Sequence, residues 1–386
     1  MTAVIAKSSS AGLKSRALRV MIVDDAIVVR GLFARWVAAE ADLETVAALR
    51  TGREAVTQLE RVDPDVVILD VDMPEMDGVT ALPLLLRKKP RLAVIMASTL
   101  TRRNAEISLK ALSLGAADYI PKPESTREVA GSQSFRRELI EKIRHLGARA
   151  REGAPRARPL DVAPRFKVEA PSIVPSATPA APAYRLRPFS SVTPRVLMIG
   201  ASTGGPQALT ALLPQLGAVI DRAPVLITQH MPPTFTTILA EHLQRASGQP
   251  VREATHGEPI VPGAVYVAPG GKHMRIAPDG GGAVVALDAG PQINFCRPSV
   301  DPLFLTGSAR WGAATLALVL TGMGSDGRHG AEAIAAAGGS VIAQDEASSV
   351  IWGMPGQAAA AGACSAVLPL TAMSAAIARL FTGERP

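Results

Sequence analysis

Short apolar runs, rich in β-branched residues, alternate along this chain with stretches of helical period, and polar or glycine-rich residues follow most of the runs. Strands that alternate with helices form parallel βαβ units. In the first part of the chain we expect strands at residues 18–23, 45–49, 65–69, 92–97 and 119–120, and helices at 27–39 and 135–146. Open parallel sheets bind ligands at the carboxyl ends of their strands, so residues directly after the strands are the candidates for chemistry.

A second series of the same kind begins near residue 195. It predicts strands at residues 195–199, 223–228 and 315–320, and helices at 206–216 and 234–246. Residues 265–267 and 284–287 flank a stretch rich in glycine and proline, and we expect them to form a hairpin-like excursion. The fold class is therefore α/β, with two doubly wound parallel-sheet domains.

A proline-rich stretch separates the two series. Residues 155–194 contain nine prolines and no sustained apolar period, a composition typical of an extended, semi-rigid connector. We expect a disordered tail at residues 1–17, a first domain at 18–147, a Pro/Ala/Arg-rich linker at 148–193 and a second domain at 194–386.

Charge and composition exclude several classes of protein. The net charge of the 386 residues is +7, but residues 196–386 carry ten Lys and Arg against twelve Asp and Glu, which argues against a basic nucleic-acid-binding domain. No apolar run approaches the ~18 residues of a membrane helix, and no secretory signal is evident at the N-terminus. Only two cysteines, Cys296 and Cys364, are present, so we expect a reducing cytoplasm and no disulfide framework.

Acidic residues gather at the predicted strand ends of the first domain. Asp24 and Asp25, Asp70, Ser98 and Lys122 each follow a strand and should converge at one edge of the sheet. Crowded carboxylates repel one another unless a hard cation such as Mg²⁺ lies among them, and such a carboxylate can attack a phosphoryl group. The alternative is that these acids are solvated or cap the following helices.

Residues 18–146 resemble the receiver domain of two-component response regulators, through the segments VDD, ILDVDMPEMDG, MAST and GAADYIPKP. The resemblance implies a flavodoxin-like fold, a phosphoacceptor at Asp70 and Mg²⁺ as the cofactor of its phosphorylation. The metal-binding residues that it implies are Asp25, Asp70 and the backbone carbonyl of Asp72, with Asp24 acting through water. The switch residues that it implies are Ser98, Tyr119 and Lys122.

In the second domain, Gly200, Ser202 and Gly204 form a G-x-S-x-G pattern directly after a predicted strand. In that pattern a nucleophilic serine occupies a tight strand-to-helix turn, and the helix behind it can stabilise an oxyanion. The alternative is a glycine-rich turn that binds phosphate or nothing.

A serine nucleophile requires a base, and His230 directly follows the predicted strand at 223–228. Of the other histidines, His145 and His242 fall within helices. We expect His256, His273 and His329 in loops, where position alone does not exclude them. The third partner would be Asp326, which lies in the glycine-rich segment after residues 315–320, although an ordinary Asp-Gly turn is the alternative. Exposed amides around Met323 could help to form an oxyanion hole.

Residues 194–386 resemble the catalytic domain of the chemotaxis protein-glutamate methylesterases. The segments that carry the resemblance are IGASTGGPQAL, ITQHMPPTFT, YVAPGGKHM, RPSVDPLF, LTGMGSDG and AQDEASSVIWGMP. It implies a Rossmann-like domain with Ser202 as nucleophile, His230 as general base and Asp326 as its orienter. Backbone amides of Thr203 and Met323 would bind the oxyanion. Ser325 departs from relatives that have asparagine there.

The resemblance also implies an activity and partners. The expected reaction is the hydrolysis of glutamyl methyl esters on chemoreceptors, with release of methanol and with glutamine deamidation as a side activity, and no cofactor for the esterase chemistry. The expected partners are methyl-accepting chemoreceptors and a histidine kinase, without nucleic acid or membrane insertion, in the cytoplasm at chemoreceptor arrays. A receiver-linked transcription factor conflicts with the charge of the second domain, and a catalytically inactive receptor-binding adaptor is the remaining alternative.

Overall fold

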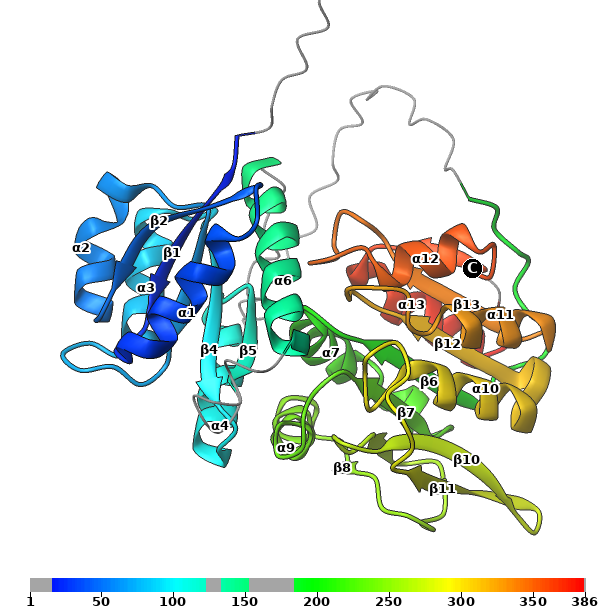
Figure 1. Cartoon of the computed structure of the whole chain (residues 1–386). Helices are drawn as coiled ribbons and strands as arrows, with labels where there is room; N and C mark the ends of the chain where they lie inside the picture. The colour runs from blue at the N-terminus through cyan, green and yellow to red at the C-terminus, as the bar shows by residue number, and fades with distance from the viewer. Residues whose placement is uncertain (1–15, 123–132, 153–183, 385–386) are drawn as a thin grey trace, which may run out of the picture.

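Two α/β domains make up the structure, a computed structural model that describes residues 16–122, 133–152 and 184–384 (Figure 1). The tail expected at residues 1–17 and the linker expected at 148–193 lie mostly outside these ranges. Of the residues expected in the linker, the structure describes 148–152, which continue a helix, and 184–193, which form no helix or strand and are mostly exposed. The last helix of the N-terminal domain runs on to Glu152, and the ring of Tyr184 packs against Trp352 of the C-terminal domain, with centroids 6.2 Å apart.

The N-terminal domain is a five-stranded, fully parallel sheet in the order β2-β1-β3-β4-β5. Its strands are β1 (Leu18–Val23), β2 (Leu43–Leu49), β3 (Val66–Asp70), β4 (Ala93–Thr99) and β5 (Asp118–Lys122). Its helices are α1 (Ile27–Ala38), α2 (Gly52–Val62), α3 (Gly78–Lys88), α4 (Arg102–Ser113) and α6 (Gln133–Glu152). The apolar runs of β1, β3 and β4, which are almost entirely buried, are the ones that the sequence marks most clearly. The strand order reverses beside β1, where an open parallel sheet binds its ligand.

The C-terminal domain contains a seven-stranded parallel sheet in the order β14-β13-β12-β6-β7-β9-β8. The strands are β6 (Val196–Ala201), β7 (Val225–Gln229), β8 (Val251–Glu253), β9 (Val265–Val267), β12 (Thr315–Val319), β13 (Ser340–Gln344) and β14 (Ala366–Leu368). The helices are α7 (Gly205–Leu212), α8 (Gly217–Ile220), α9 (Phe235–Ser247), α10 (Val300–Trp311), α11 (Arg328–Ala336), α12 (Met354–Ala360) and α13 (Leu370–Phe381). β6, the first strand of this domain in chain order, lies between β7 and β12, so the ends of these three strands lie side by side.

The hairpin expected between residues 265–267 and 284–287 is wrong. β9 pairs in parallel with β7 and β8 in the main sheet. The hairpin consists instead of β10 (His273–Asp279) and β11 (Gly282–Asp288). A three-residue apolar run such as β9 carries too little pattern to reveal its partners, which here come from distant parts of the chain.

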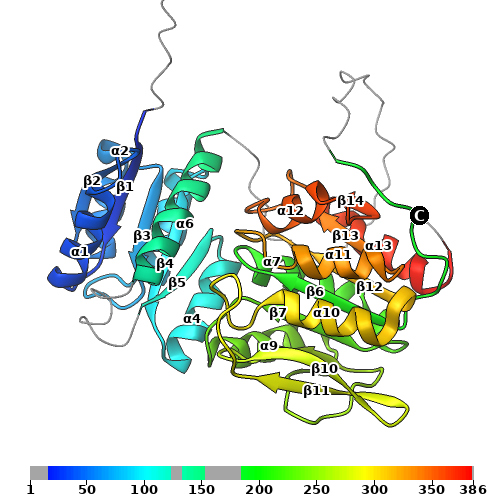
Figure 2. The same cartoon turned by 45° about the vertical axis from the view of Figure 1, so that its right-hand side comes forward.

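The two domains are in contact through the α4–β5 side of the N-terminal domain (Figures 1 and 2). α4 packs against α9 and α7, and Arg102 Nη2 donates to both carboxylate oxygens of Glu241 at 2.8 Å. At the other end of the contact, Ile351 is buried in the hydrophobic cluster that includes α6. The domain contact therefore combines apolar burial with an exposed ion pair.

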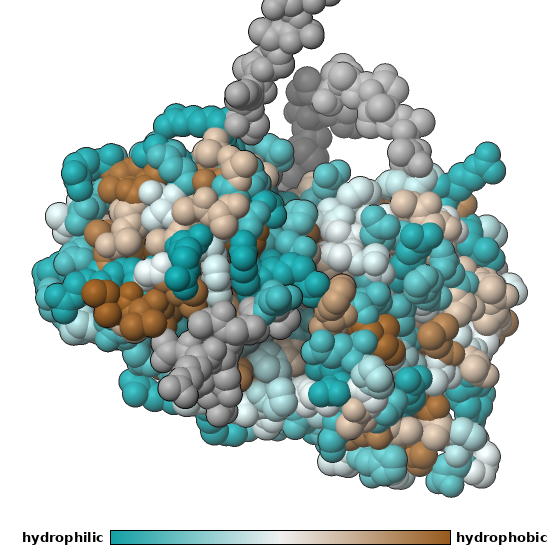
Figure 3. Space-filling view, in the orientation of Figure 1, coloured by the Kyte–Doolittle hydropathy of each residue, from teal (hydrophilic) through white to brown (hydrophobic). Residues whose placement is uncertain are grey.

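Apolar side chains reach the surface of the N-terminal domain, where Figure 3 shows brown areas among the hydrophilic residues. The most exposed large apolar residues of this domain are Ile27 and Val28, at the first turn of α1, which are 75% and 61% exposed. No helix among the described residues has the length and apolar character that a bilayer crossing requires.

Candidate functional site

Three carboxylates meet at the carboxyl edge of the N-terminal sheet, as the sequence predicted. Oxygen atoms of Asp24, Asp25 and Asp70 all lie within 4.8 Å of one another. Asp24 and Asp70 are buried, whereas Asp25 is exposed. Oxygen donors crowded in this way suit a hard divalent cation such as Mg²⁺. The donor set of this edge therefore fits the metal that the sequence implied.

Lys122 lies against two of these acids. Its Nζ is 2.6 Å from Asp70 Oδ1 and 3.2 Å from Asp24 Oδ2. Burial and the neighbouring charge of Asp24 raise the pKa of Asp70 to about 7, although Lys122 opposes the shift. Burial would lower the pKa of Lys122, but the two carboxylates raise it. The lysine is therefore a fixed cation beside the candidate phosphoacceptor.

The two other predicted switch residues occupy different surroundings. Ser98 Oγ is buried and shares a hydrogen bond with Ser108 Oγ at 2.9 Å. Tyr119, only 5% exposed, faces the other domain, where its ring stacks on Phe235 with centroids 5.1 Å apart. Asp72 lies near this edge as well, and its side chain accepts a hydrogen bond from Asn104 Nδ2 at 3.1 Å.

In the C-terminal domain, the G-x-S-x-G segment forms a tight turn between β6 and α7. A Cβ on Gly200 would lie 2.5 Å from a methyl group of Val300, so only glycine fits there. Gly204 has φ +78°, in the left-handed region that glycine adopts without strain. Ser202 lies between them and is partly exposed.

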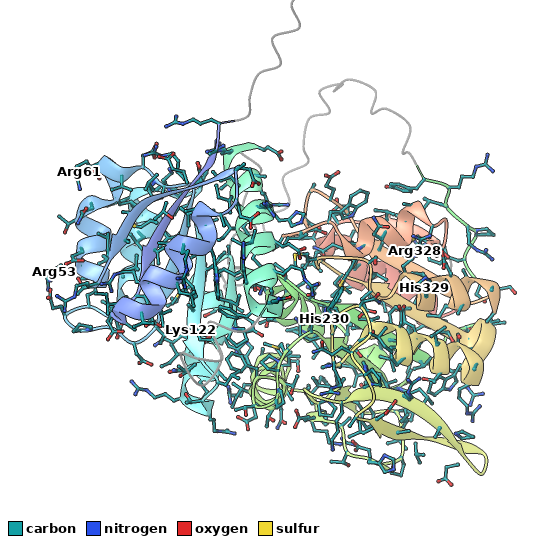
Figure 4. The ribbon with its side chains drawn as sticks, in the orientation of Figure 1. Arg53, Arg61, Lys122, His230, Arg328 and His329 are labelled. Carbon is teal, nitrogen blue, oxygen red and sulfur yellow. The ribbon has the colours of Figure 1, made fainter. Side chains whose placement is uncertain are left out.

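Strand register places Ser202 beside His230. Ala201 pairs with Gln229 across β6 and β7, and the next residues along are Ser202 and His230. His230 Nε2 lies 2.7 Å from Asp326 Oδ2, with the side chains 11% and 2% exposed. The structure therefore brings together the three residues that the sequence grouped. Figure 4 shows His230 in the C-terminal domain and Lys122 in the other.

Asp326 is the best-hydrogen-bonded carboxylate of this site. It accepts hydrogen bonds from Ser299 Oγ at 2.7 Å and from the Val300 amide, at the start of α10, at 2.6 Å. Burial would raise the pKa of Asp326, but the hydrogen bond to His230 and those from Val300 and Ser299 lower it. Burial likewise would lower the pKa of His230, but Cys296 and Asp326 raise it well above its usual value.

The backbone amides proposed for oxyanion binding are available. Within the described residues, neither the Thr203 nor the Met323 N–H donates a hydrogen bond to a protein acceptor. Both lie at strand ends next to Ser202, because the Ser202 amide donates to Thr321 O at 3.0 Å. Free amides beside a nucleophile can stabilise negative charge that develops on a substrate oxygen.

Within the described residues, no other histidine forms a hydrogen bond with Ser202, His230 or Asp326. His273 is not in a loop, as expected, but begins β10 and is buried, with Nδ1 accepting from the Ser299 amide. His329 lies on α11, also not in a loop, and is 71% exposed on its side chain. His256 is exposed and accepts from the Leu287 amide. His145 is exposed and His242 half-buried on their helices.

Sequence reasoning missed the residues that surround the His230–Asp326 pair. Cys296 Sγ lies 3.3 Å from His230 Nδ1, and Asn294 Nδ2 donates to Asp326 Oδ1 at 3.1 Å. Ser299, which holds the carboxylate, precedes α10 at its N-cap position. A serine before an apolar helical run is a recognisable cap signal, but nothing local marks Asn294 or Cys296.

Two protein-family models match this chain. The CheB methylesterase family matches residues 197–377, and the response regulator receiver domain matches residues 20–132. A crystal structure of the Thermotoga maritima CheB methylesterase catalytic domain is 38% identical and covers 49% of this chain and 100% of its own, with a TM-score of 0.47.

Full-length relatives are also similar. The protein-glutamate methylesterase/protein-glutamine glutaminase of group 2 operon from Bradyrhizobium diazoefficiens is 60% identical, and the match covers 100% of both chains. The protein-glutamate methylesterase/protein-glutamine glutaminase of Nitrobacter hamburgensis is 58% identical over 99% of both chains.

Proposed function

This chain belongs to the family of CheB methylesterases that carry a receiver domain, and we propose that it is a phosphorylation-activated protein-glutamate methylesterase. It hydrolyses γ-glutamyl methyl esters on chemoreceptors and deamidates receptor glutamines, the two activities in the names of its relatives. The observation that supports this most directly is the His230–Asp326 pair, 2.7 Å apart, beside Ser202 at the end of β6.

In the proposed reaction, Ser202 Oγ attacks the ester carbonyl carbon while His230 accepts the hydroxyl proton. Asp326 holds the ring at Nε2, so Nδ1 is the nitrogen left to serve as the base. The carbonyl oxygen becomes an oxyanion, which the free amides of Thr203 and Met323 stabilise. One such donor typically contributes a factor of roughly 100–1,000 in rate.

The intermediate then collapses. The bond from the carbonyl carbon to the methoxy oxygen breaks, His230 protonates the departing methanol, and an acyl-serine remains. Water attacks this ester in the second half, gives its proton to His230 and leaves a receptor glutamate with Ser202 restored. A primary amide presents the same carbonyl, so a glutamine would release ammonia by the same steps.

The receiver would control this chemistry through Asp70, which accepts a phosphoryl group from a histidine kinase. Asp25, Asp70 and the carbonyl of Asp72 would hold Mg²⁺, with Asp24 acting through water, and the ion would neutralise the phosphoryl charge. Lys122, already 2.6 Å from Asp70, would contact the new phosphoryl oxygens. Ser98 would leave Ser108 for the phosphoryl group, and Tyr119 would carry the change to the domain contact.

A methanol-release assay on methylated chemoreceptor membranes tests the proposal, with full-length protein in the presence and absence of a small-molecule phosphodonor. Methanol release that the donor accelerates is the expected result. Stable receptor binding without methanol release in either condition would instead identify an inactive adaptor. We also propose that the protein acts in the cytoplasm at chemoreceptor arrays, where both its substrate and a kinase would be present.

A further inference from the structure

A tight turn of the esterase domain, residues 293–296, contacts both the His230–Asp326 pair and the receiver. Backbone hydrogen bonds in both directions between Ile293 and Cys296 close the turn. Its two central residues, Asn294 and Phe295, have φ values of +51° and +63°. Such a left-handed pair fixes the directions of consecutive side chains. Three successive residues of this turn make three different contacts.

Two of these contacts lie within the esterase domain. Cys296 Sγ is 3.3 Å from His230 Nδ1, and Asn294 Nδ2 donates to Asp326 Oδ1 at 3.1 Å. The turn therefore contacts both members of the His230–Asp326 pair. Asn294, before Phe295, contacts Asp326, and Cys296, after Phe295, contacts His230.

The third contact reaches the receiver. The guanidinium of Arg137, on α6, lies 3.6 Å from the centre of the Phe295 ring. Even with this contact Phe295 remains 70% exposed, so little else among the described residues packs against its ring. Such contacts contribute modestly at exposed sites, which suits a contact that a regulatory event must break.

The contact with Cys296 occupies the nitrogen that catalysis needs. Nε2 of His230 is engaged by Asp326, and Nδ1 by the thiol of Cys296. Within the described residues the hydroxyl of Ser202 has no hydrogen-bond partner, so the nucleophile and its base are not coupled in this state. Whichever of the two atoms carries the proton, Nδ1 is engaged by the sulfur and is not free to take the hydroxyl proton of Ser202.

The ionisable groups that contact the His230 ring among the described residues are Asp326, on the loop after β12, and Cys296, on the turn. Burial would lower the pKa of His230, but these two groups raise it well above its usual value. A raised pKa favours the protonated ring, and a protonated ring cannot accept the proton of Ser202.

We infer that the turn at residues 293–296 positions Cys296 as a restraint on His230, and that Arg137 of the docked receiver holds this turn through Phe295. The inference rests on the proposed function of His230 as the base. Release of the turn would free Nδ1 for Ser202. The receiver would thus act on the catalytic base itself, in addition to any obstruction of the substrate.

The first test removes the thiol from the full-length, unphosphorylated protein. Cys296→Ala should raise methanol release by at least about fivefold, the lower end of typical couplings between sites. The gain should be largest at low pH, because the rising limb of the pH profile moves to lower pH. Cys296→Ser keeps a hydroxyl that can bond to Nδ1 and should give an intermediate rate. Cys364→Ala removes the other thiol, which is buried far from His230 in sequence and is the matched control.

The second test acts from the receiver. Arg137→Gln should also raise the resting rate, and it should add nothing in a Cys296→Ala background, because both changes release the same nitrogen. Arg136→Gln is the matched control, since Arg136 pairs with Glu40 inside the receiver. Additive effects of Arg137→Gln and Cys296→Ala, or resting rates that stay unchanged or fall in both, would overturn the inference.

A readout without turnover separates this inference from the proposed function. The imidazole of His230 can be titrated by NMR in the full-length protein, where Cys296→Ala should lower its pKa and Cys364→Ala should not. An unchanged titration in Cys296→Ala would refute the restraint. If no variant released methanol even with the phosphodonor, the proposed function would fail, while a lowered pKa would still establish the contact of the turn with His230.

Discussion

The phenol ring of Tyr119 in the receiver lies almost parallel to the ring of Phe235 in the esterase domain, with an interplanar angle of 9° and centroids 5.1 Å apart. Tyr119 belongs to β5, one strand away from Ser98 on β4, and Phe235 begins α9, five residues after His230. A change in the position of Tyr119 would therefore act on a helix that begins five residues after His230, the proposed base.

Ser202→Ala should abolish ester hydrolysis without unfolding the protein, because the serine is partly exposed on a turn whose shape depends on its neighbouring glycines. Members of a catalytic triad act as a unit, so we expect a loss of about 10⁴–10⁶-fold in kcat. Methanol release measures the loss, and circular dichroism checks the fold. A variant that retained more than a small part of the wild-type turnover would remove Ser202 from the role of nucleophile.

His230→Ala should be as inactive as Ser202→Ala, whereas His256→Ala should remain active, since His256 is exposed and accepts a hydrogen bond from the Leu287 amide. His273→Ala is a more demanding control. His273 is buried and bonded to Pro291 O and to the Ser299 amide, so its loss should lower stability more than the rate per folded molecule. If His273→Ala were inactive at full folding while His230→Ala kept its activity, the base would have to be reassigned.

The resting enzyme should show an alkaline-shifted pH profile. Its base works only when unprotonated, and the contacts with Cys296 and Asp326 raise the pKa of His230 despite burial. The rate should therefore increase with pH through a midpoint above about 6.5, the ordinary pKa of histidine. A kcat/KM profile of unphosphorylated protein provides the measurement. A midpoint at or below the ordinary value would contradict a raised pKa of His230 in the resting enzyme.

Asp70→Asn should block phosphorylation and leave the resting esterase rate in place, because the amide cannot form an acyl phosphate. Incorporation of a labelled phosphoryl group into the wild type should require Mg²⁺, since Asp24, Asp25 and Asp70 lie within 4.8 Å of one another and repel without a cation. Label that persists in Asp70→Asn, or that survives a chelator in the wild type, is the result that speaks against this site.

Much of the molecule follows from the sequence for a physical reason. Buried strands such as β3 are continuous apolar runs. The polar residue that follows each run can be read from the sequence, and it marks a candidate site residue. Parallel register then brings Ser202 next to His230 and gathers the acids of the receiver. The tight turn after β6 is also predictable, because glycine is needed at Gly200, where a side chain would clash, and favoured at Gly204, which has a positive φ.

The features that could not be predicted from the sequence depend on contacts between segments that are distant along the chain. β9 has three residues, too few for the sequence to indicate its partners, and the predicted hairpin with residues 284–287 is wrong. Cys296 and Asn294 show no periodicity or spacing relative to His230 and Asp326, and only the folded turn brings them together. The contact of Phe295 with Arg137 joins two domains and leaves no local signal at either residue.

The domain contact itself should restrain the resting enzyme, and the ion pair between Arg102 and Glu241 offers a direct way to weaken it. Arg102 donates to both oxygens of Glu241 at 2.8 Å, so Arg102→Glu or Glu241→Arg would place like charges against each other between α4 and α9. Either change should raise the unphosphorylated methanol-release rate by up to roughly fivefold, because exposed ion pairs contribute little individually. The activation by phosphodonor should shrink in proportion.

The combined swap, Arg102→Glu with Glu241→Arg, restores opposite charges and should return the resting rate toward that of the wild type. Arg53→Glu makes the same charge change on α2, which lies on the side of the receiver away from the esterase domain (Figure 4), and should leave the rate unchanged. Because the pair is exposed, added salt should reduce the difference between the single variants and the wild type. Single variants that behave like the Arg53 control, or a double swap that is no closer to wild type than either single change, would mean that the contact between α4 and α9 does not restrain the esterase.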